Sequence, residues 1–338
     1  MITPYVQISR DAVAHNVRLI HAAATSGGKL WAPRLSRCVP DEILSDIVLP
    51  FTDRASCGRI EDAEALADRG FRHLVVTRPV VDAEALSRLS TLLHRAELLV
   101  TIDHFRQAEL LSLAASPVDG GVCVLIDVDL GQRTTGVRPG PDASRLASAA
   151  STLPGIRVVG VHANDCGTSL QPSAEQLSAF DDMMTVARHC RRTMANDGVH
   201  CEEIATGSHC NFALSCQQDK VTLVMCDPFG NTLPDAIVSP VNDNDDRLSP
   251  AVSVISRVIS RPAFEWCVIN AGTQIFGSSG NAAVLQPRGA RVLTASADVA
   301  TLSLSSFALD LRIGDTVQLS VRHPGEILDR LDDRFNSR

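Results

Sequence analysis

Along the first two-thirds of the chain, segments with the apolar periodicity of a helix alternate with short apolar runs typical of buried strands. Apolar residues recur at helical spacing in five segments, residues 10–24, 60–69, 82–95, 104–115 and 173–196. Between them lie short, nearly continuous apolar runs at 73–77, 97–102, 122–128 and 156–162. Helices that alternate with fully apolar strands are typical of a parallel sheet whose faces are both covered. Because the pattern repeats over so much of the chain, it favours a TIM-type (β/α)8 barrel over an open doubly wound sheet.

From about residue 250 the pattern changes. Strand-like runs at 251–261, 266–270, 291–295 and 315–322 are separated by Gly, Pro and Asp turns, and we expect no helix among them. The predicted fold class is therefore α/β. An N-terminal TIM-type (β/α)8 barrel is expected over residues 1–248 and a C-terminal, mainly β domain over 249–338. The first strand, at about residues 3–9, is a candidate member of the β domain.

Composition and charge narrow the function classes. The chain has 338 residues, 45% of them hydrophobic, and a formal net charge of −8. The acidic balance argues against a nucleic-acid or membrane-surface binder. No apolar run reaches the roughly 18 residues of a membrane span, and the first residues lack a signal-peptide pattern. We therefore expect a cytoplasmic protein that binds neither nucleic acid nor a membrane.

Two residue types limit the chemistry. The ten cysteines contain no CxxC pair, and in a cytoplasmic chain they are interpreted as reduced core thiols. Lysine is rare: of the 31 Lys and Arg residues, only Lys29 and Lys220 are lysines. A Schiff base requires a lysine amine, so only these two side chains could form one.

Six stretches along the chain carry a family resemblance. They are TPYVQISRDAVAHNVRLI near the start, SCGRIEDAE at 56–64, DVDLGQRTTGV at 127–137, VISRVISR at 254–261, INAG at 269–272 and IGDTVQLSVRH at 313–323. In this order they resemble the D-threonine aldolase / D-serine dehydratase group of the alanine racemase-like superfamily, the fold-type III pyridoxal-phosphate (PLP) enzymes. The resemblance implies a barrel followed by a β-domain. It also implies a homodimer that completes its sites across the interface, with a heterodimer with an active paralogue as the alternative.

The segment in which the resemblance implies the PLP lysine has no lysine at the expected place. It reads KLWAPRLSRCVPDE. An ungapped alignment to Pro40 puts Leu35 at the lysine position, and a shift of one residue puts Arg34 there. Neither side chain can form an imine, and Lys29 lies upstream in the same segment.

Four further positions depart from the family pattern. Thr134 stands for the barrel arginine, with Arg133 one place early, and Gln274 stands for the lysine of Gly-Ser-Lys in the β-domain. Asn164 stands roughly for the cofactor tyrosine, and Gly325 replaces the second metal ligand beside His323. The resemblance therefore predicts a kept scaffold without the family's catalytic apparatus: no covalent PLP and no metal, with non-covalent PLP left open.

Polar residues at the expected carboxyl ends of the barrel strands form the candidate site, because barrel sites lie there. A first set is the candidate catalytic group, since imidazole and carboxylate exchange protons near neutral pH: His162, Asp165 and His209. A second set is the candidate ligand-binding group: Arg34, Arg133, Asn164, Gly207 and Ser208.

Each candidate has a structural alternative. Arg34 could bind a carboxylate or a phosphate through bidentate hydrogen bonds. Alternatively, it could be solvated or pair with Asp41 or Glu42. The amides of Gly207 and Ser208 could bind a phosphate, or they could form an ordinary turn after a strand. His162 could act on a ligand, or it could point into the barrel with a purely structural role.

Three functions remain open. The first is a diverged, non-catalytic homologue, a pseudoenzyme that binds a small anionic or amino-acid-like ligand or a partner subunit. The second is a PLP-independent enzyme of lyase or isomerase type that acts on an amino-acid-derived substrate. The third is a conventional PLP-dependent D-amino-acid lyase, against which the missing lysine argues.

Overall fold

The computed structural model describes residues 2–116, 118, 120–131, 133–163, 174–207, 211–230, 248–277, 282–321, 324–325 and 327–328. These residues form two compact units. The described residues of 17–228 make up the barrel unit, and those of 2–16, 229–230 and 248–328 make up the β unit. Within these ranges, none of the helices combines the length and apolarity that a bilayer crossing demands.

Eight parallel strands form the barrel, in the order β2-β9-β8-β7-β6-β5-β4-β3. A parallel bridge between Arg34 and Ser56 joins the two ends of this sheet and closes it. The Leu35 N–H donates to the Ser56 carbonyl, and the Ser56 N–H donates to the Pro33 carbonyl, both at 2.8 Å. The predicted TIM-type barrel is thus confirmed. Its strands are β2 (Leu30–Trp31), β3 (Arg54–Cys57), β4 (His73–Val76), β5 (Glu97–Ile102), β6 (Val122–Val128), β7 (Ile156–Ala163), β8 (Glu203–Thr206) and β9 (Leu223–Val224).

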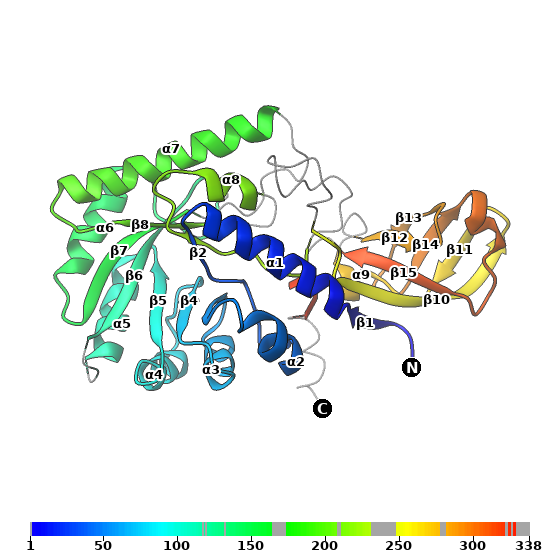
Figure 1. The fold of residues 1–338 in the computed structure, drawn as a ribbon, viewed down its shortest axis with the longest axis horizontal. Coiled ribbons are helices and arrows are strands. Elements are labelled where there is room, and N and C mark those ends of the chain that lie inside the picture. Colours follow the sequence, from blue (N-terminus) through cyan, green and yellow to red (C-terminus); the bar gives the residue numbers. More distant parts are fainter. Residues whose placement is uncertain are drawn as a thin grey trace. The chain divides into compact units, whose positions relative to one another are not determined.

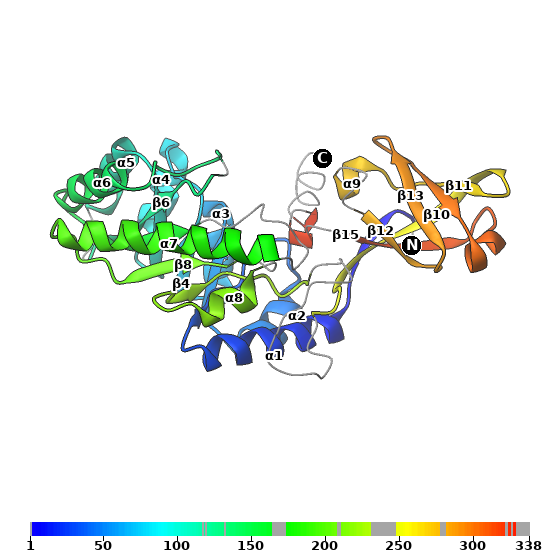
Figure 2. The same ribbon diagram turned by 90° about the horizontal axis from the view of Figure 1, so that it is seen from above.

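Helices α3 to α7 lie around the outside of these strands (Figures 1 and 2). The five helices expected from periodicity are present with small shifts of their ends, and a π-helical turn, Leu44–Val48, follows α2. The sequence did not predict α6, because its buried face consists mostly of Ala and Ser and gives little hydrophobic contrast. The helices of this region are α1 (Arg10–Ser26), α2 (Asp41–Ile43), α3 (Ile60–Asp68), α4 (Ala83–Leu92), α5 (Phe105–Ala115), α6 (Pro141–Ser151), α7 (Ala174–Asn196) and α8 (Phe212–Gln217).

The β unit is an antiparallel sheet in the order β12-β15-β10-β11-β14-β13. The first strand of the chain, β1, pairs with β10, with Tyr5 opposite Ile255. The mainly β fold of this region is as predicted. One short helix, α9 (Thr273–Phe276), and a 3-10 turn, Ser306–Asp310, were not expected, because a single turn is too short to show helical periodicity. The strands are β1 (Tyr5–Ile8), β10 (Val252–Ala263), β11 (Trp266–Ile269), β12 (Ala282–Gln286), β13 (Ala290–Ala295), β14 (Ala300–Leu304) and β15 (Thr316–Val321).

The described cysteines form no disulfide with one another. Burial raises the pKa of the Cys201 thiol to about 11 and that of Cys216 to about 12. These thiols are therefore protonated and unreactive near neutral pH, as expected for core residues.

Charged side chains lie near the amino ends of the barrel strands. His73 Nδ1 contacts Glu97 Oε2 at 3.0 Å, and Arg157 Nη2 donates to Cys123 Sγ at 2.7 Å. Burial raises the pKa of the Glu203 carboxyl, and the attraction of Arg54 and Arg157 only partly opposes this effect. Glu203 is thus the residue of this layer whose ionised form is disfavoured by folding.

We predict that Glu203→Gln becomes more stabilising, relative to the wild type, as the pH rises. A carboxyl whose pKa is higher in the folded state destabilises the fold once both states are ionised, and this penalty is absent below the unfolded-state pKa. The difference in melting temperature, variant minus wild type, should therefore grow from pH 5 to pH 8. Glu97→Gln, on the exposed partner of His73, is the control. A difference that shrinks over this range would contradict the prediction.

Candidate functional site

The inner layer of the barrel defines which residues face its mouth. Apolar side chains from most of the strands pack there as one cluster, with Leu99 and Val159 against it: Ala32, Val75, Leu125, Ala205, Leu223 and Met225. Successive side chains of a strand point to opposite faces, so the residue two places beyond each cluster member faces the same side, nearer the carboxyl end. This rule selects the mouth positions Arg34, Thr77, Thr101, Asp127, Gly207 and Asp227.

A buried histidine–carboxyl pair lies at this level. Asp127 on β6 and His162 on β7 are register partners, and His162 Nδ1 contacts Asp127 Oδ1 at 2.7 Å. Asp127 is fully buried and His162 is 6% exposed. The contact occupies Nδ1 and leaves Nε2 as the second ring atom for proton exchange. The sequence singled out His162 but missed its partner.

Two polar atoms near the pair are buried without a hydrogen bond. Within the described residues, Asp127 Oδ2 and Thr101 Oγ1 have no partner. Buried polar groups are normally satisfied, and an orphaned one calls for a water, an ion or a ligand. Because both atoms belong to mouth positions, they mark this end of the barrel as the candidate site.

The loop after β6 is shaped by one carboxylate and two glycines. Asp129 Oδ1 accepts from the backbone N–H groups of Gly131 and Arg133, at 2.9 and 3.1 Å. Gly136 has φ +117°, and a Cβ there would lie only 2.4 Å from the Asp129 nitrogen, so the loop requires glycine at that position. Arg133 itself has φ +54° and an exposed side chain, and its role as a ligand residue stays a prediction.

Two arginines meet at the first strands of the barrel. Arg34 is exposed and follows Ala32 on the inward-facing register, whereas Leu35 is 3% exposed and buried. A Cβ placed on Gly58 would lie 3.3 Å from Arg78 Nε and 3.6 Å from Arg34 Nη2, so both guanidinium groups reach the same glycine. In the described part of the chain neither makes an ion pair; Asp41, a partner considered for Arg34, pairs with Arg69. Two neighbouring guanidinium groups without a carboxylate partner among the described residues could together bind an anion.

Gly207 is required where it stands. Its φ is +109°, and a Cβ would lie 2.6 Å from Val224 Cγ1 on the neighbouring strand. This close approach explains the glycine without a ligand, so anion binding by its amide stays a prediction. The other predicted site residues lie outside the described residues: Asn164, Asp165, Ser208 and His209.

The described residues contain no group of three or more His, Cys, Asp or Glu side chains that could hold a metal ion. His323 lies outside these residues, so the expectation that no metal binds stays untested.

Both lysines lie at the amino ends of barrel strands. Lys29 directly precedes β2, and its Nζ donates to the Gln218 carbonyl at 2.8 Å. Lys220 lies three residues before β9. In a parallel barrel the amino ends lie at the rim opposite the mouth.

Sequence reasoning missed five residues at or beside the mouth: Thr77, Arg78, Thr101, Asp127 and Asp227. Asp127 opens the quoted stretch DVDLGQRTTGV. Asp227 is 6% exposed and follows Met225 by two positions. The alternation of side chains along a strand would have identified both Asp127 and Asp227, because each lies two residues after an inward-facing apolar residue. Arg78 gave no such signal, because its place beside Gly58 depends on the pairing of two strands.

Known proteins share this fold. The family described as "Alanine racemase, N-terminal domain" matches residues 8–203. Two curated relatives are a D-threonine aldolase of Arthrobacter sp., 22% identical over 64% of this chain, and a 3-hydroxy-D-aspartate aldolase of Paracoccus denitrificans, 24% identical over 53%. The matched parts cover 57% and 46% of those proteins, so this chain aligns with about half of their length.

Two solved structures agree with the architecture. D-threonine aldolase from Filomicrobium marinum superposes with a TM-score of 0.87 at 21% identity, over 98% of this chain and 90% of that one. D-threo-3-hydroxyaspartate dehydratase from Delftia sp. HT23 superposes with a TM-score of 0.75 at 18% identity, over 98% and 93%. At these identities the likeness shows the fold alone.

We predict that His162→Ala lowers the free energy of unfolding by about 3–5 kcal/mol near neutral pH, because it leaves a fully buried carboxyl without its partner. Urea titration measures the loss, and His189→Ala on the exposed side of α7 is the control. The double variant Asp127→Ala/His162→Ala should recover part of the stability. If the two single losses simply add in the double variant, the pair is not coupled and the prediction is wrong.

Proposed function

Because the chain belongs to the alanine racemase N-terminal domain family, of the fold-type III PLP superfamily, we propose that it is a diverged relative of the D-threonine aldolase group that binds a small anion at the barrel mouth. The ligand class is a phosphate ester or an amino-acid carboxylate. The protein holds it without an imine and is a non-catalytic homologue of its lyase relatives.

The observation that carries this proposal is the pair Arg34 and Arg78 beside Gly58. Both guanidinium groups lack a carboxylate partner within the described residues, although the chain as a whole is acidic. A guanidinium presents two parallel N–H donors that match a carboxylate or a phosphate. The unpaired charges favour an anionic ligand, and the barrel wall limits its size.

The mouth residues do not fit a covalently held PLP. When bound as an imine, PLP serves as an electron sink for the substrate's α-carbon. That bond needs an amine near the carboxyl ends of the strands, and the inward position there is Arg34. Lys29 and Lys220 precede their strands, and the Lys29 ammonium is engaged with the Gln218 carbonyl. Non-covalent binding through the PLP phosphate remains compatible with the two arginines.

A second candidate function is proton transfer without PLP on an amino-acid-derived substrate. The buried pair His162 and Asp127 favours it, because the carboxyl orients the ring through Nδ1 and leaves Nε2 to exchange a proton. In that case Arg34 and Arg78 would hold the substrate's carboxylate while His162 moves a proton at its α-carbon. The orphaned Asp127 Oδ2 and Thr101 Oγ1 would then contact substrate or an ordered water.

We predict that Arg34→Gln and Arg78→Gln each weaken ligand binding by about 10- to 150-fold, as expected when one charge-assisted contact of roughly 1.5–3 kcal/mol is lost. Calorimetric titration with PLP, inorganic phosphate and a panel of D-amino acids measures the affinity. Arg145→Gln is the matched control, because this arginine on α6 is exposed and pairs with Asp142.

Two results would overturn the proposal. If the wild type binds none of these ligands, or if both variants bind as well as the wild type, the mouth is not an anion site and a partner-binding role gains support. If borohydride reduction with PLP leaves a stoichiometric pyridoxyl group on Lys29 or Lys220, the protein forms an imine and is a conventional PLP lyase. Peptide mass mapping distinguishes such an adduct from partial labelling of other amines.

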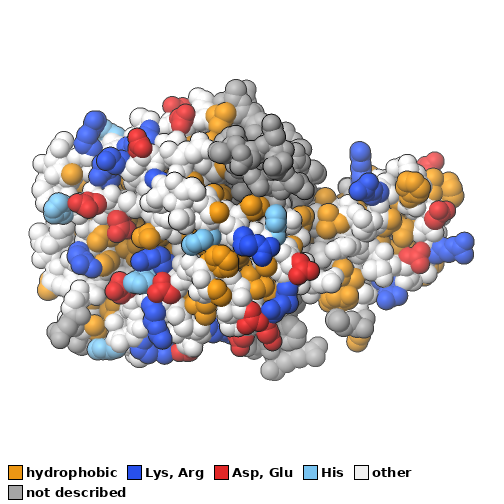
Figure 3. All heavy atoms as spheres, viewed as in Figure 1, with side chains coloured by type: hydrophobic (Ala, Val, Ile, Leu, Met, Phe, Trp, Pro, Cys, Tyr) orange, Lys and Arg blue, Asp and Glu red, His pale blue; other side chains and the backbone are white. Residues whose placement is uncertain are grey.

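We also propose that the protein assembles as a homodimer. In support, seven large apolar side chains of the β unit are exposed: Ile2, Ile259, Phe264, Trp266, Leu293, Phe307 and Ile313. Figure 3 shows hydrophobic side chains on the surface of this unit. Light scattering should give twice the chain mass of 36.2 kDa. Phe264→Glu/Trp266→Glu should shift the mass toward the monomer, while Leu113→Glu on the barrel unit should not. A monomeric wild type would instead favour a heterodimer with a paralogue.

A further inference from the structure

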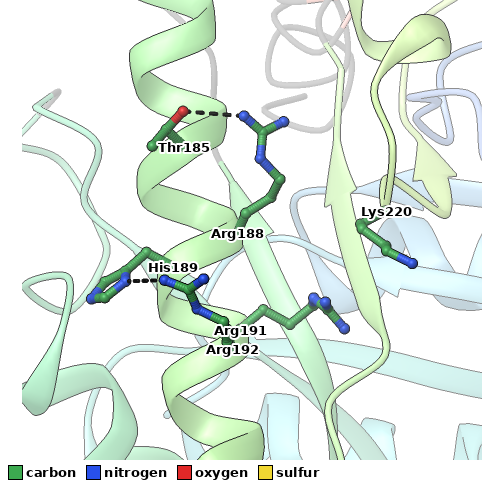
Figure 4. A pocket seen from close by; sticks show the side chains of 6 residues that line it. All are labelled: Thr185, Arg188, His189, Arg191, Arg192 and Lys220. Atoms are coloured by element: carbon green, nitrogen blue, oxygen red, sulfur yellow. Dashed lines mark hydrogen bonds between the residues drawn. The ribbon is translucent and has the colours of Figure 1, made fainter.

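A second cationic site lies on the outer side of the barrel unit. Helix α7 and the segment before β9 border an open hollow of about 410 Å3, a volume within the range of small-molecule sites. Figure 4 shows Arg188 and Arg191 extending from α7 toward the side on which Lys220 lies. The lining residues are Thr185, Arg188, His189, Arg191, Arg192 and Lys220.

This hollow is distinct from the barrel mouth. Lys220 precedes β9, and Arg188 to Arg192 lie in the last third of α7, the helix that returns from the end of β7 to the start of β8. Both segments therefore belong to the amino-end rim of the barrel, opposite the mouth.

The cations of the hollow are not neutralised. Arg188 donates to Gln218 Oε1 at 2.7 Å and to Thr185 Oγ1 at 3.1 Å, and Arg191 donates to the Cys201 carbonyl at 3.2 Å. Arg192 contacts His189 Nδ1 at 3.5 Å. None of these partners is a carboxylate. As far as the described residues extend, none of the three arginines and Lys220 makes an ion pair with a carboxylate.

Some arginines of other segments do have carboxylate partners. Arg88 on α4 pairs with Glu84 and Glu64, and Asp142 pairs with both Arg138, just before α6, and Arg145 on α6. The three arginines of α7 have no such partner among the described residues, in a protein of net charge −8.

The arrangement destabilises the helix that carries it. Arg188 lies three and four residues before Arg191 and Arg192, and like charges at these spacings repel across a helix surface. In addition, Arg191 Nε is buried without a hydrogen-bond partner within the described residues. A bound anion would neutralise the repulsion and supply acceptors to these donors.

We propose that this hollow binds a small polyvalent anion of the class of di- and triphosphate esters. Three arginines and one lysine line this hollow, which is more positive charge than a single carboxylate neutralises, and planar guanidinium groups match phosphate oxygens in pairs. The hollow accommodates a small molecule, and the acidic chain around it disfavours a nucleic acid, which needs an extended basic surface.

The test uses the full-length protein and inorganic pyrophosphate in calorimetric titration at low salt. The wild type should bind one pyrophosphate at this site at least ten-fold more tightly than inorganic phosphate, and added NaCl should weaken binding. Arg188→Gln/Arg192→Gln should weaken pyrophosphate binding at least ten-fold. Lys220→Gln, on a different segment, should also weaken it and serves if the double variant fails to fold.

The matched control is Arg138→Gln/Arg145→Gln, which removes the same charge from α6 and the segment just before it and should leave binding unchanged. Arg34→Gln, which removes a cation from the barrel mouth, should leave in place the pyrophosphate binding that Arg188→Gln/Arg192→Gln weakens, and this separates the two sites. The proposal is overturned if the wild type shows no saturable binding, if the control double variant loses as much affinity as the α7 variant, or if Arg34→Gln alone abolishes binding.

Discussion

Closure of the parallel barrel is the constraint on which the candidate site depends. The bridge between Arg34 and Ser56 joins the ends of the sheet, and Ser56 Oγ donates to the Ala32 carbonyl at 3.0 Å across the same seam. Once the sheet is closed, alternate side chains of every strand face one interior. Because an apolar layer fills the middle of that interior, polar groups can face inward only above or below it.

This layering separates the two rims by chemistry. At the mouth, Arg34 and Arg78 have no carboxylate partner in the part of the chain that the structure describes, and Asp127 with His162 forms a buried polar pair. At the amino-end rim, His73 and its neighbours contact one another, and the cationic hollow of α7 lies farther out. Charges that meet a partner within the fold stabilise or position neighbouring groups. A charged group without a partner in the fold gains the most free energy when a ligand from solution binds to it.

Local pattern predicted most of the elements of the chain. Strands such as β5 and β6 are apolar throughout, and helices such as α1 and α7 show clear periodicity, so each was evident from its own residues. The exceptions are informative, because α6 buries small side chains and α9 is a single turn. For the site, His162 and Arg34 were identified from their expected places at strand ends. Their neighbours were not, because Asp127 and Arg78 become neighbours only through strand pairing.

By itself, the sequence determined the alternation of helices and strands in the barrel, the change to strands near residue 250, the family resemblance and the scarcity of lysine, since each is a property of neighbouring residues or of composition. Only the tertiary structure decided that Arg34 rather than Leu35 faces inward, and that His162 meets Asp127. A register shift between Val124 and Leu125 fixes which residue of β7 lies opposite Asp127, 35 positions away in the chain. Such a shift is set by packing between strands, and for that reason no local pattern could reveal it.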